Sequence, residues 1–205
     1  MHEKKVGRVA VLLSGRGSNF NALYRDSLAS DSGYRVVLVV SDNRDAPGLR
    51  RAREHGLETV FLDPELFCGR PAFSLQLVKE LEARKVDLVC LAGFMRILGR
   101  RVVDAYGGRI LNIHPALLPA FPGLNAQRRA LEYGVKCSGC TVHFVDRGMD
   151  TGPIVLQECV EVCDSDNEDS LSRRILEMEH QLFPRAVRLF FAGVLHLQGR
   201  RVRIK

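Results

Sequence analysis

The first apolar stretch of the chain reads Arg8-Val-Ala-Val-Leu-Leu-Ser14, and the polar turn Gly15-Arg-Gly-Ser-Asn19 follows it directly. The apolar residues form a continuous run, which is typical of a strand that is buried on both faces of a sheet. Two glycines then interrupt the run, and Ser18 or Asn19 can cap a helix that continues to Tyr24. The stretch therefore predicts a strand, a tight turn and a helix, which is the opening unit of a parallel α/β sheet.

The same alternation of strand and helix continues along the chain. Further buried strands are expected at Arg35 to Ser41, Thr59 to Leu62, Val86 to Ala92 and Arg109 to Ile113. Helices are expected between them at Gly48 to His55 and Pro71 to Arg84. Strands that are apolar on both faces and alternate with helices indicate a mainly parallel sheet with helices on both faces.

The later part of the chain has a different pattern. Gly139 to Val145 and Ile154 to Val162 alternate between apolar and polar residues, which predicts an antiparallel extension. A long helix from about Asp169 to Phe191 follows, and Val194 to Ile204 resembles a small hairpin. We therefore expect a single-domain, Rossmann-like α/β fold over residues 1–205, with its core at about 8–192, an antiparallel C-terminal extension and a tail at 193–205.

Composition restricts the class of protein. The 205 residues are 46% hydrophobic and 26% charged, which excludes a disordered or fibrous chain. Thirty Lys and Arg against 24 Asp and Glu give a net charge of +6, which suits anionic ligands such as phosphates or polycarboxylates and, taken alone, nucleic acid. The apolar runs are strand-sized, so we expect a cytoplasmic protein with no signal peptide and no membrane helix.

The six cysteines leave two interpretations open. Cys137 and Cys140 match the C-x-x-C pattern, and Cys159 and Cys163 follow, so the four thiols could hold zinc or the first pair could be a redox dithiol. However, Cys140 alternates with Val142 in one predicted strand, and Cys159 lies inside another. This placement favours cysteines that act as small apolar residues of a strand, and we expect no metal.

Three polar clusters follow predicted strands. They are Ser14 to Asn19, Ala92 to Arg96 and Asn112 to Pro115. In an open parallel sheet, ligands bind beyond the carboxyl ends of the strands, where these clusters meet. Their coincidence predicts a ligand site at this edge of the sheet.

The first cluster has the features of an anion site. Backbone N–H groups of a glycine-rich turn, together with the helix dipole, attract an anion. The turn is no P-loop, because no Gly-Lys-Ser/Thr follows, and it is a poor dinucleotide fingerprint, because Phe20 stands where the third glycine belongs. Ser18 and Asn19 add side-chain donors, so a single phosphate fits better than a dinucleotide. The alternative is a tight turn with an N-cap and no ligand.

The third cluster contains groups that suit acyl transfer. Asn112 and His114 flank Ile113 on one strand, so both polar side chains point to the same face. An amide donor beside an imidazole can bind an oxyanion and move a proton. The alternative is a histidine that only makes hydrogen bonds in a turn at the end of the strand. Asp150 is a possible third member, and a carboxylate there would hold the imidazole charged. The apolar loop from Pro115 to Gly123 could form one wall of a pocket for a flat ligand, or it could be only a rigid connection.

Five motifs in order carry a resemblance to a known family. They are Ser14 to Asn19, Leu91 to Leu98, Asn112 to Pro119, Thr141 to Val145 and Met149 to Pro153. From about Val9 to Phe191 the chain resembles the phosphoribosylglycinamide formyltransferases (glycinamide ribonucleotide transformylases), a folate-dependent family of purine synthesis. The resemblance implies transfer of the formyl group of 10-formyltetrahydrofolate to the amine of glycinamide ribonucleotide, which yields formylglycinamide ribonucleotide and tetrahydrofolate.

The resemblance also implies roles for individual residues. His114 would be the catalytic residue that stabilises the tetrahedral oxyanion as imidazolium and assists proton transfer. Asn112 would hydrogen-bond the formyl oxygen, and Asp150 would support the charged imidazole and organise a proton-relaying water. The bond between Leu118 and Pro119 is similar to others that are cis.

Binding residues follow from the same resemblance. The ribonucleotide site would comprise Gly17, Ser18, Asn19, Leu176, Glu177, Met178 and Glu179, with Glu179 as the ribose ligand. The formyl-folate site would comprise Arg70, Met95, Arg96, Ile97, Leu98, Asn112, Asp146, Arg147, Gly148, Met149 and Asp150, with the last five in a loop that closes over the pterin. The implied partners are the two small-molecule substrates, with no metal, nucleic acid or membrane, and a monomer or homodimer. Residues 125–128 depart from the family pattern.

Three other functions remain to be weighed. A 10-formyltetrahydrofolate hydrolase uses a similar Asn, His and Asp set, but would be expected to lack the Gly-Ser-Asn turn. Methionyl-tRNA formyltransferase is similar, but normally adds a tRNA-binding domain. A non-catalytic nucleotide- or RNA-binding module would account for the charge and the glycine-rich turn, but leaves Asn112, His114 and Asp150 unexplained and has no aromatic platform.

Overall fold

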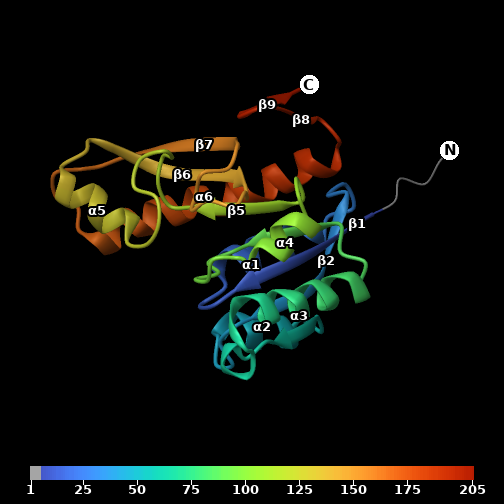
Figure 1. Cartoon of the computed structure of the whole chain (residues 1–205). Coiled ribbons are helices and arrows are strands. Elements are labelled where there is room, and N and C mark those ends of the chain that lie inside the picture. The colour runs from blue at the N-terminus through green and yellow to red at the C-terminus, as the bar shows by residue number, and fades with distance from the viewer. Residues whose placement is uncertain (1–5) are drawn as a thin grey trace. The chain divides into compact units, whose positions relative to one another are not determined.

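The computed structural model describes residues 6–205. These residues divide into two compact units, the first ending at Leu111 and the second running from Asn112 to Lys205. Figure 1 labels their helices and strands. A single domain over the whole chain stays a prediction, and each unit has its own arrangement of elements.

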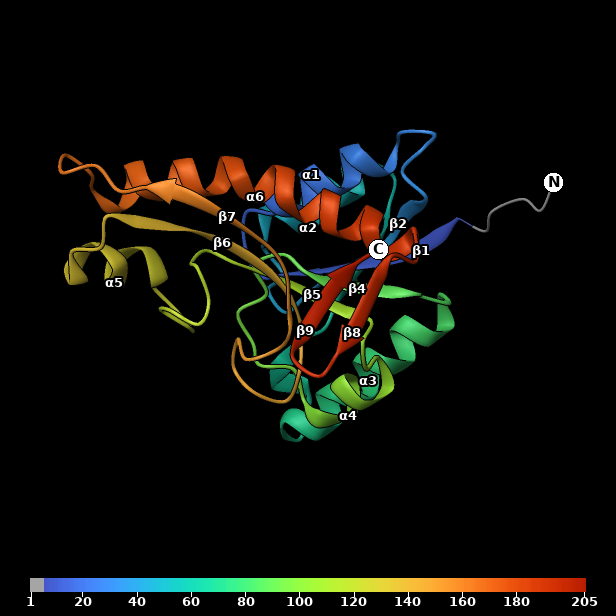
Figure 2. The same ribbon diagram turned by 90° about the horizontal axis from the view of Figure 1, so that it is seen from above.

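The first unit is a parallel sheet with helices on both faces. Its strands are β1 (Gly7–Leu13), β2 (Tyr34–Ser41), β3 (Glu58–Phe61) and β4 (Leu88–Leu91), in the order β3-β2-β1-β4. Its helices are α1 (Ser18–Ser27), α2 (Pro47–Glu54), α3 (Gly69–Ala83) and α4 (Arg100–Ala105), with a 3-10 turn, η1, at Pro64–Leu66. Figure 2 shows α1 and α2 on one face of this sheet and α3 and α4 on the other. The mainly parallel α/β fold expected from the sequence is confirmed.

The continuous apolar run that opens the chain forms the centre of this sheet. All five residues from Val9 to Leu13 are 0% exposed, and β1 pairs with β2 on one side and β4 on the other. Phe20 and Leu23 of α1 are likewise fully buried. A strand between two others, covered on both faces, has no solvated side, which explains why its sequence does not alternate.

The second unit contains the antiparallel extension. Its elements are β6 (Cys137–Phe144), β7 (Ile154–Glu161), β8 (Leu195–Gln198), β9 (Arg201–Ile204), α5 (Ala126–Tyr133) and α6 (Glu168–Phe191). Strands β6 and β7 are antiparallel, as are β8 and β9, so the predicted extension, long helix and tail hairpin are confirmed. The short helices α4 and α5 escaped the sequence analysis. Within the described range 6–205, no helix is long and apolar enough to cross a membrane.

Strand β5 (Ile110–His114) spans the boundary between the units, and its last three residues belong to the second. Strand β6 separates two environments. Cys140 and Val142 lie on one of its faces, and Thr141 and His143 lie on the other. The pairing with β7 shifts by one residue between Val142 and His143, which is a local irregularity of the kind that re-aims a side chain.

Candidate functional site

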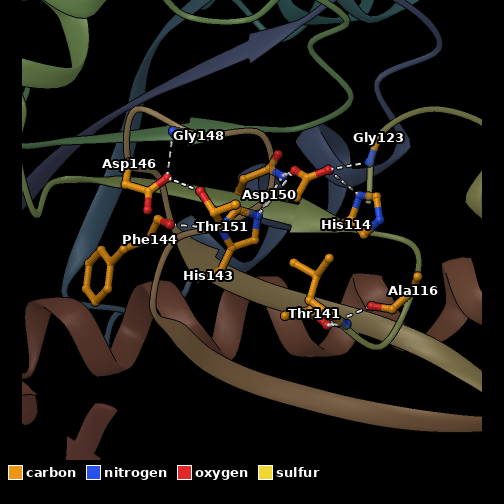
Figure 3. Close-up of polar contacts among 12 residues, drawn as sticks. His114, Ala116, Gly123, Thr141, His143, Phe144, Asp146, Gly148, Asp150 and Thr151 are labelled. Atoms are coloured by element: carbon orange, nitrogen blue, oxygen red, sulfur yellow. Dashed lines mark hydrogen bonds and ion pairs between the residues drawn. The ribbon is translucent and has the colours of Figure 1, made fainter. Parts of the chain in front are cut away.

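His114 ends β5 as a buried side chain, with 5% of its surface exposed. Its Nε2 lies 2.9 Å from the carbonyl oxygen of Phe121. Its Nδ1 lies 3.4 Å from Oδ2 of Asp150 (Figure 3). A carbonyl oxygen only accepts, so Nε2 carries the hydrogen in the neutral ring. Nδ1 then faces the carboxylate without a hydrogen. A proton added to Nδ1 would be donated to the Asp150 carboxylate.

Asp150 is held at several points by the second unit. The backbone N–H of Gly123 donates to Oδ2 at 2.7 Å, and Nδ2 of Asn112 donates to Oδ1 at 3.4 Å. Its backbone has a φ of +54°, a left-handed conformation that Asp tolerates better than most residues. The structure thus brings together Asn112, His114 and Asp150, as the sequence analysis predicted.

A fourth side chain, His143, completes this cluster. It is 2% exposed, its Nε2 lies 3.1 Å from Nδ2 of Asn112 and 3.6 Å from Oδ1 of Asp150, and its Nδ1 lies 2.8 Å from the carbonyl oxygen of Phe144. Because that carbonyl requires a hydrogen on Nδ1, Nε2 accepts from the amide and fixes its orientation. Sequence reasoning quoted His143 in a motif without giving it a role. Its alternation with Thr141 on a predicted strand was the available signal.

The local charges give His114 and Asp150 opposite roles. Burial lowers the pKa of His114 below its usual 6.5, and this outweighs the raising effects of Asp150 and of the hydrogen bond to Phe121. The expectation that the carboxylate keeps the imidazole charged is therefore wrong for the free protein. Burial raises the pKa of Asp150, but the nearby His143, the N–H of Gly123 and the positive charge that His114 can carry outweigh it and lower the pKa to about 2. At neutral pH, a carboxylate thus faces a mostly neutral imidazole.

A rigid loop presents Phe121 and Gly123 to the cluster. Thr141 Oγ1 donates to the Ala116 carbonyl at 2.7 Å and accepts from the Leu118 N–H at 3.1 Å. Nε2 of Gln157 donates both to Thr141 Oγ1 at 3.0 Å and to the Leu118 carbonyl at 2.8 Å. The bond from Leu118 to Pro119 is cis, as expected. These contacts fasten the start of the loop to the face of β6 that carries His143.

The segment that leads to Asp150 is a tight turn. Oδ1 of Asp146 accepts from the Gly148 N–H at 3.0 Å and from the Thr151 hydroxyl at 2.6 Å (Figure 3). Met149 is exposed at its tip. The predicted folate-loop residues, Asp146 to Asp150, therefore adjoin the cluster with a defined backbone shape.

The predicted ribose ligand lies elsewhere in the second unit. Leu176, Glu177, Met178 and Glu179 are on α6, and Glu179 is buried with 6% exposure. The charge of Glu179 acts on Cys140, which belongs to the face of β6 opposite His143. The structure therefore does not bring Glu179 into the cluster around His114, and its role as ribose ligand stays a prediction.

The predicted anion turn belongs to the first unit. α1 begins at Ser18, and its N-cap is Gly17, which has a φ of +72° and provides no side-chain cap. The expectation that Ser18 or Asn19 caps the helix is therefore wrong, because the chain turns one residue earlier. A Cβ on Gly17 would lie 2.6 Å from Cα of Gly48, whose N–H donates to the Gly15 carbonyl at 3.1 Å. The two glycines bring the turn against the start of α2.

Three further predicted binding segments adjoin one another in the first unit. The loop after β4 is irregular, and its Met95 N–H donates to Oγ of Ser14 at 2.9 Å. Arg70, in the first turn of α3, has its Cγ 3.3 Å from where a Cβ on Gly99 would lie. Arg96 lies over a phenyl ring of α3, 5.8 Å from its centroid. The loop that contains Met95 to Leu98 is thus held by the anion turn on one side and by α3 on the other.

Substitution of Gly17 by Ala should disrupt the turn. The new Cβ would meet backbone at 2.6 Å with a positive φ, so we expect the free energy of unfolding to fall by about 2–4 kcal/mol. Gly15→Ala is the matched control, because nothing lies within 4 Å of its Cβ position, and it should cost less than about 1 kcal/mol. Urea unfolding of both variants measures the difference, and equal costs would contradict the close approach as the reason for glycine.

No three or more His, Cys, Asp or Glu side chains of residues 6–205 form a group that could hold a metal ion. The side chains gathered around His114 are an amide, a second imidazole and a carboxylate, which donate and accept hydrogen bonds.

Comparisons with known proteins identify the family. The formyl transferase family model matches residues 7–187. A crystal structure of glycinamide ribonucleotide transformylase 1 from Symbiobacterium toebii has a TM-score of 0.95 and 51% identity, and the alignment covers 97% of this chain and 94% of that one.

Curated relatives agree with this match. Phosphoribosylglycinamide formyltransferase of Escherichia coli (strain K12) is 41% identical over 189 residues, which are 92% of this chain and 89% of the relative. Trifunctional purine biosynthetic protein adenosine-3 of Drosophila melanogaster is 47% identical over 188 residues, and this chain spans only 14% of its length. The resemblance seen in the sequence motifs is confirmed, and the chain belongs to the formyl transferase family.

Proposed function

We propose that the chain transfers the formyl group of 10-formyltetrahydrofolate to the amine of glycinamide ribonucleotide. The observation that carries the proposal is the cluster of Asn112, His114, His143 and Asp150, which combines an amide donor with a neutral imidazole and an ionised carboxylate. The relatives named phosphoribosylglycinamide formyltransferase support the same reaction. The proposal includes a cytoplasmic location and a monomer or homodimer.

The attack of the amine on the formyl carbon converts the carbonyl into an oxyanion. Asn112 donates its amide hydrogen to that oxygen. In the free protein, one hydrogen of Nδ2 is donated to His143 and the other to Asp150. The contact to Asp150 is the longer of the two, at 3.4 Å, so this hydrogen bond breaks when the amide donates to the formyl oxygen. A donor preset in this way is worth about 3–4 kcal/mol of transition-state stabilisation.

His114 receives the proton that the amine loses. A water held by Asp150 relays this proton to Nδ1, because Nε2 already donates to Phe121. The resulting imidazolium forms an ion pair with Asp150, and its positive charge stabilises the oxyanion of the tetrahedral adduct. Collapse of the adduct breaks the bond from the formyl carbon to the folate nitrogen, which takes the proton back.

The remaining assigned residues position the two substrates. Gly17, Ser18 and Asn19 at the start of α1 bind the phosphate through backbone N–H groups and side-chain donors. In the first unit, Arg70 and the loop from Met95 to Leu98 are assigned to the folate. In the second unit, the turn from Asp146 to Asp150 is assigned to the folate, and the four residues from Leu176 to Glu179 are assigned to the ribonucleotide.

The first experiment follows loss of the formyl group from 10-formyltetrahydrofolate by absorbance, with and without glycinamide ribonucleotide. Turnover that requires the ribonucleotide supports the transfer reaction. Turnover without any acceptor supports the hydrolase instead. No turnover in either reaction contradicts both and favours a binding module.

His143 should act as a positioning residue for Asn112. Replacement by Leu removes the acceptor for the amide, so we expect kcat to fall by roughly 10–100-fold while KM changes little. His143→Gln retains an acceptor and should keep more of the activity than His143→Leu. Steady-state kinetics of both variants, with thermal unfolding as a check of folding, provide the measurement. Equal activity in the two variants would show that the hydrogen bond to Asn112 does not matter.

A further inference from the structure

The C-x-x-C pattern of the sequence does not form a thiol pair in the fold. Cys137 and Cys140 are three residues apart on β6 and point to opposite faces of the strand. Cys137 is exposed, whereas Cys140 is buried, and burial raises the pKa of the Cys140 thiol to about 12. The spacing that suggested a zinc or redox motif therefore separates the two sulfur atoms.

Strand pairing supplies a different partner for Cys137. In the register of β6 and β7, Cys137 lies opposite Glu161, and Gly139 lies opposite Cys159. Cys137 and Cys159 are thus diagonal neighbours on one face of the hairpin, a spacing at which two short side chains meet only when both turn toward each other. Both residues are exposed.

The glycine between them leaves the path between the two thiols open. Gly139 itself places no side chain between Cys137 and Cys159, because a Cβ there would lie 2.0 Å from the Glu158 carbonyl oxygen and 3.0 Å from Cδ2 of Leu117. Burial and the neighbouring Cys159 thiol raise the pKa of the Cys137 thiol above its usual value. The S–H of Cys137 donates to the carbonyl oxygen of Ser138 at 3.5 Å.

We propose that Cys137 and Cys159 form a reversible intramolecular disulfide by exchange with a low-molecular-weight disulfide such as oxidised glutathione. The inference goes beyond the proposed function and does not rest on it. It concerns a modification site at the exposed Cys137 end of β6, on the face that further along the strand carries Thr141 and His143, and formed by residues that the reaction does not use.

The exchange balances in two steps. One thiolate of the pair attacks a sulfur of the small disulfide, forms a mixed disulfide and expels one small thiolate. The second protein thiol, after losing its proton, attacks the protein sulfur of the mixed disulfide and expels the second small thiolate. The protein pair is oxidised by two electrons, and the two small thiolates take up the two protons. Because the pKa of Cys137 is raised, the rate should increase as the pH rises from 7 to 9.

The test treats the full-length chain with oxidised glutathione at alkaline pH and maps the products by mass spectrometry. Trypsin cleaves after Lys136, Arg147 and Arg173, so Cys137 and Cys140 fall in one peptide and Cys159 and Cys163 in another. We expect these two peptides to be joined by a bond that dithiothreitol cleaves. The oxidised chain should also unfold about 5 °C above the reduced chain, because the cross-link restricts the unfolded state.

Two matched variants identify the pair. Cys159→Ser should abolish the cross-link, whereas Cys163→Ser, which removes another exposed thiol just beyond β7, should retain it. The proposal is overturned if glutathione adds only mixed disulfides without a cross-link. It is equally overturned if Cys163→Ser removes the cross-link and Cys159→Ser does not. Both serine variants carry a substitution at an exposed position, so each should fold.

Discussion

Replacing His114 by Ala should lower kcat for formyl transfer by roughly 10²–10⁴-fold. The imidazole of His114 faces Asp150 through the ring nitrogen that can take up a proton near neutral pH, and alanine cannot carry that proton. Steady-state kinetics with both substrates measure the effect. KM for the folate should change much less, because the ring acts mainly on the adduct.

Two further variants make the His114 result specific. His196→Ala removes a histidine from the exposed strand β8 and should leave kcat within about twofold of the original, since surface substitutions rarely have larger effects. His114→Gln keeps a polar side chain of similar size and should be as inactive as His114→Ala. If His114→Gln retains high activity, the ring acts by hydrogen bonding alone and the proton-transfer role is wrong.

Replacing Asp150 by Asn should lower kcat by roughly 10²–10³-fold, the range for loss of a preset electrostatic group. The amide has almost the same shape, so the hydrogen bond from Gly123 can remain while the charge that stabilises the imidazolium is lost. Asp164→Asn is the matched control, because Asp164 carries an exposed ion pair with Lys136 far from any assigned role. It should leave kcat unchanged.

The pH profile of Asp150→Asn distinguishes an electrostatic role from a structural one. The reaction starts from neutral His114, so kcat/KM should fall as the pH drops through the His114 pKa, which lies below 6.5. Asp150 raises that pKa, so removal of its charge should move the acid limb to still lower pH. Asp150 itself, with a pKa of about 2, stays ionised over this range. An acid limb that stays in place, or moves upward, would contradict the assignment.

The sequence predicted the fold through its apolar runs. A central strand such as β1 must be apolar on both faces, and the period-two pattern of β6 and β7 reflects different environments on their two sides. Helices α4 and α5 were missed because they are short, six and eight residues, and carry few buried side chains to make a helical period visible.

The candidate site was predictable only in part. Asn112 and His114 are two residues apart, so strand geometry alone places them together. Asp150 was a possible third member from its loop and received its role through the family resemblance, and the structure puts its carboxylate 3.4 Å from the ring. The contact from Gly123 comes from a backbone N–H, which no residue type reveals. The lowered pKa of His114 depends on burial in the folded chain, and therefore could not be read from the neighbouring carboxylate.

The contact between Gly17 and Gly48 has a consequence for how the chain can evolve. A Cβ on either residue would lie within 3 Å of the Cα of the other, so each glycine is required because of its partner as well as its own backbone. Once one substitution has pushed the turn and α2 apart, the second disrupts fewer contacts. The loss in the free energy of unfolding should therefore be smaller for the double variant than the sum of the losses for the two single variants. Such coupling makes every single-step path away from the pair pass through a damaged intermediate. Two positions 31 residues apart are therefore expected to be retained, or to change, together.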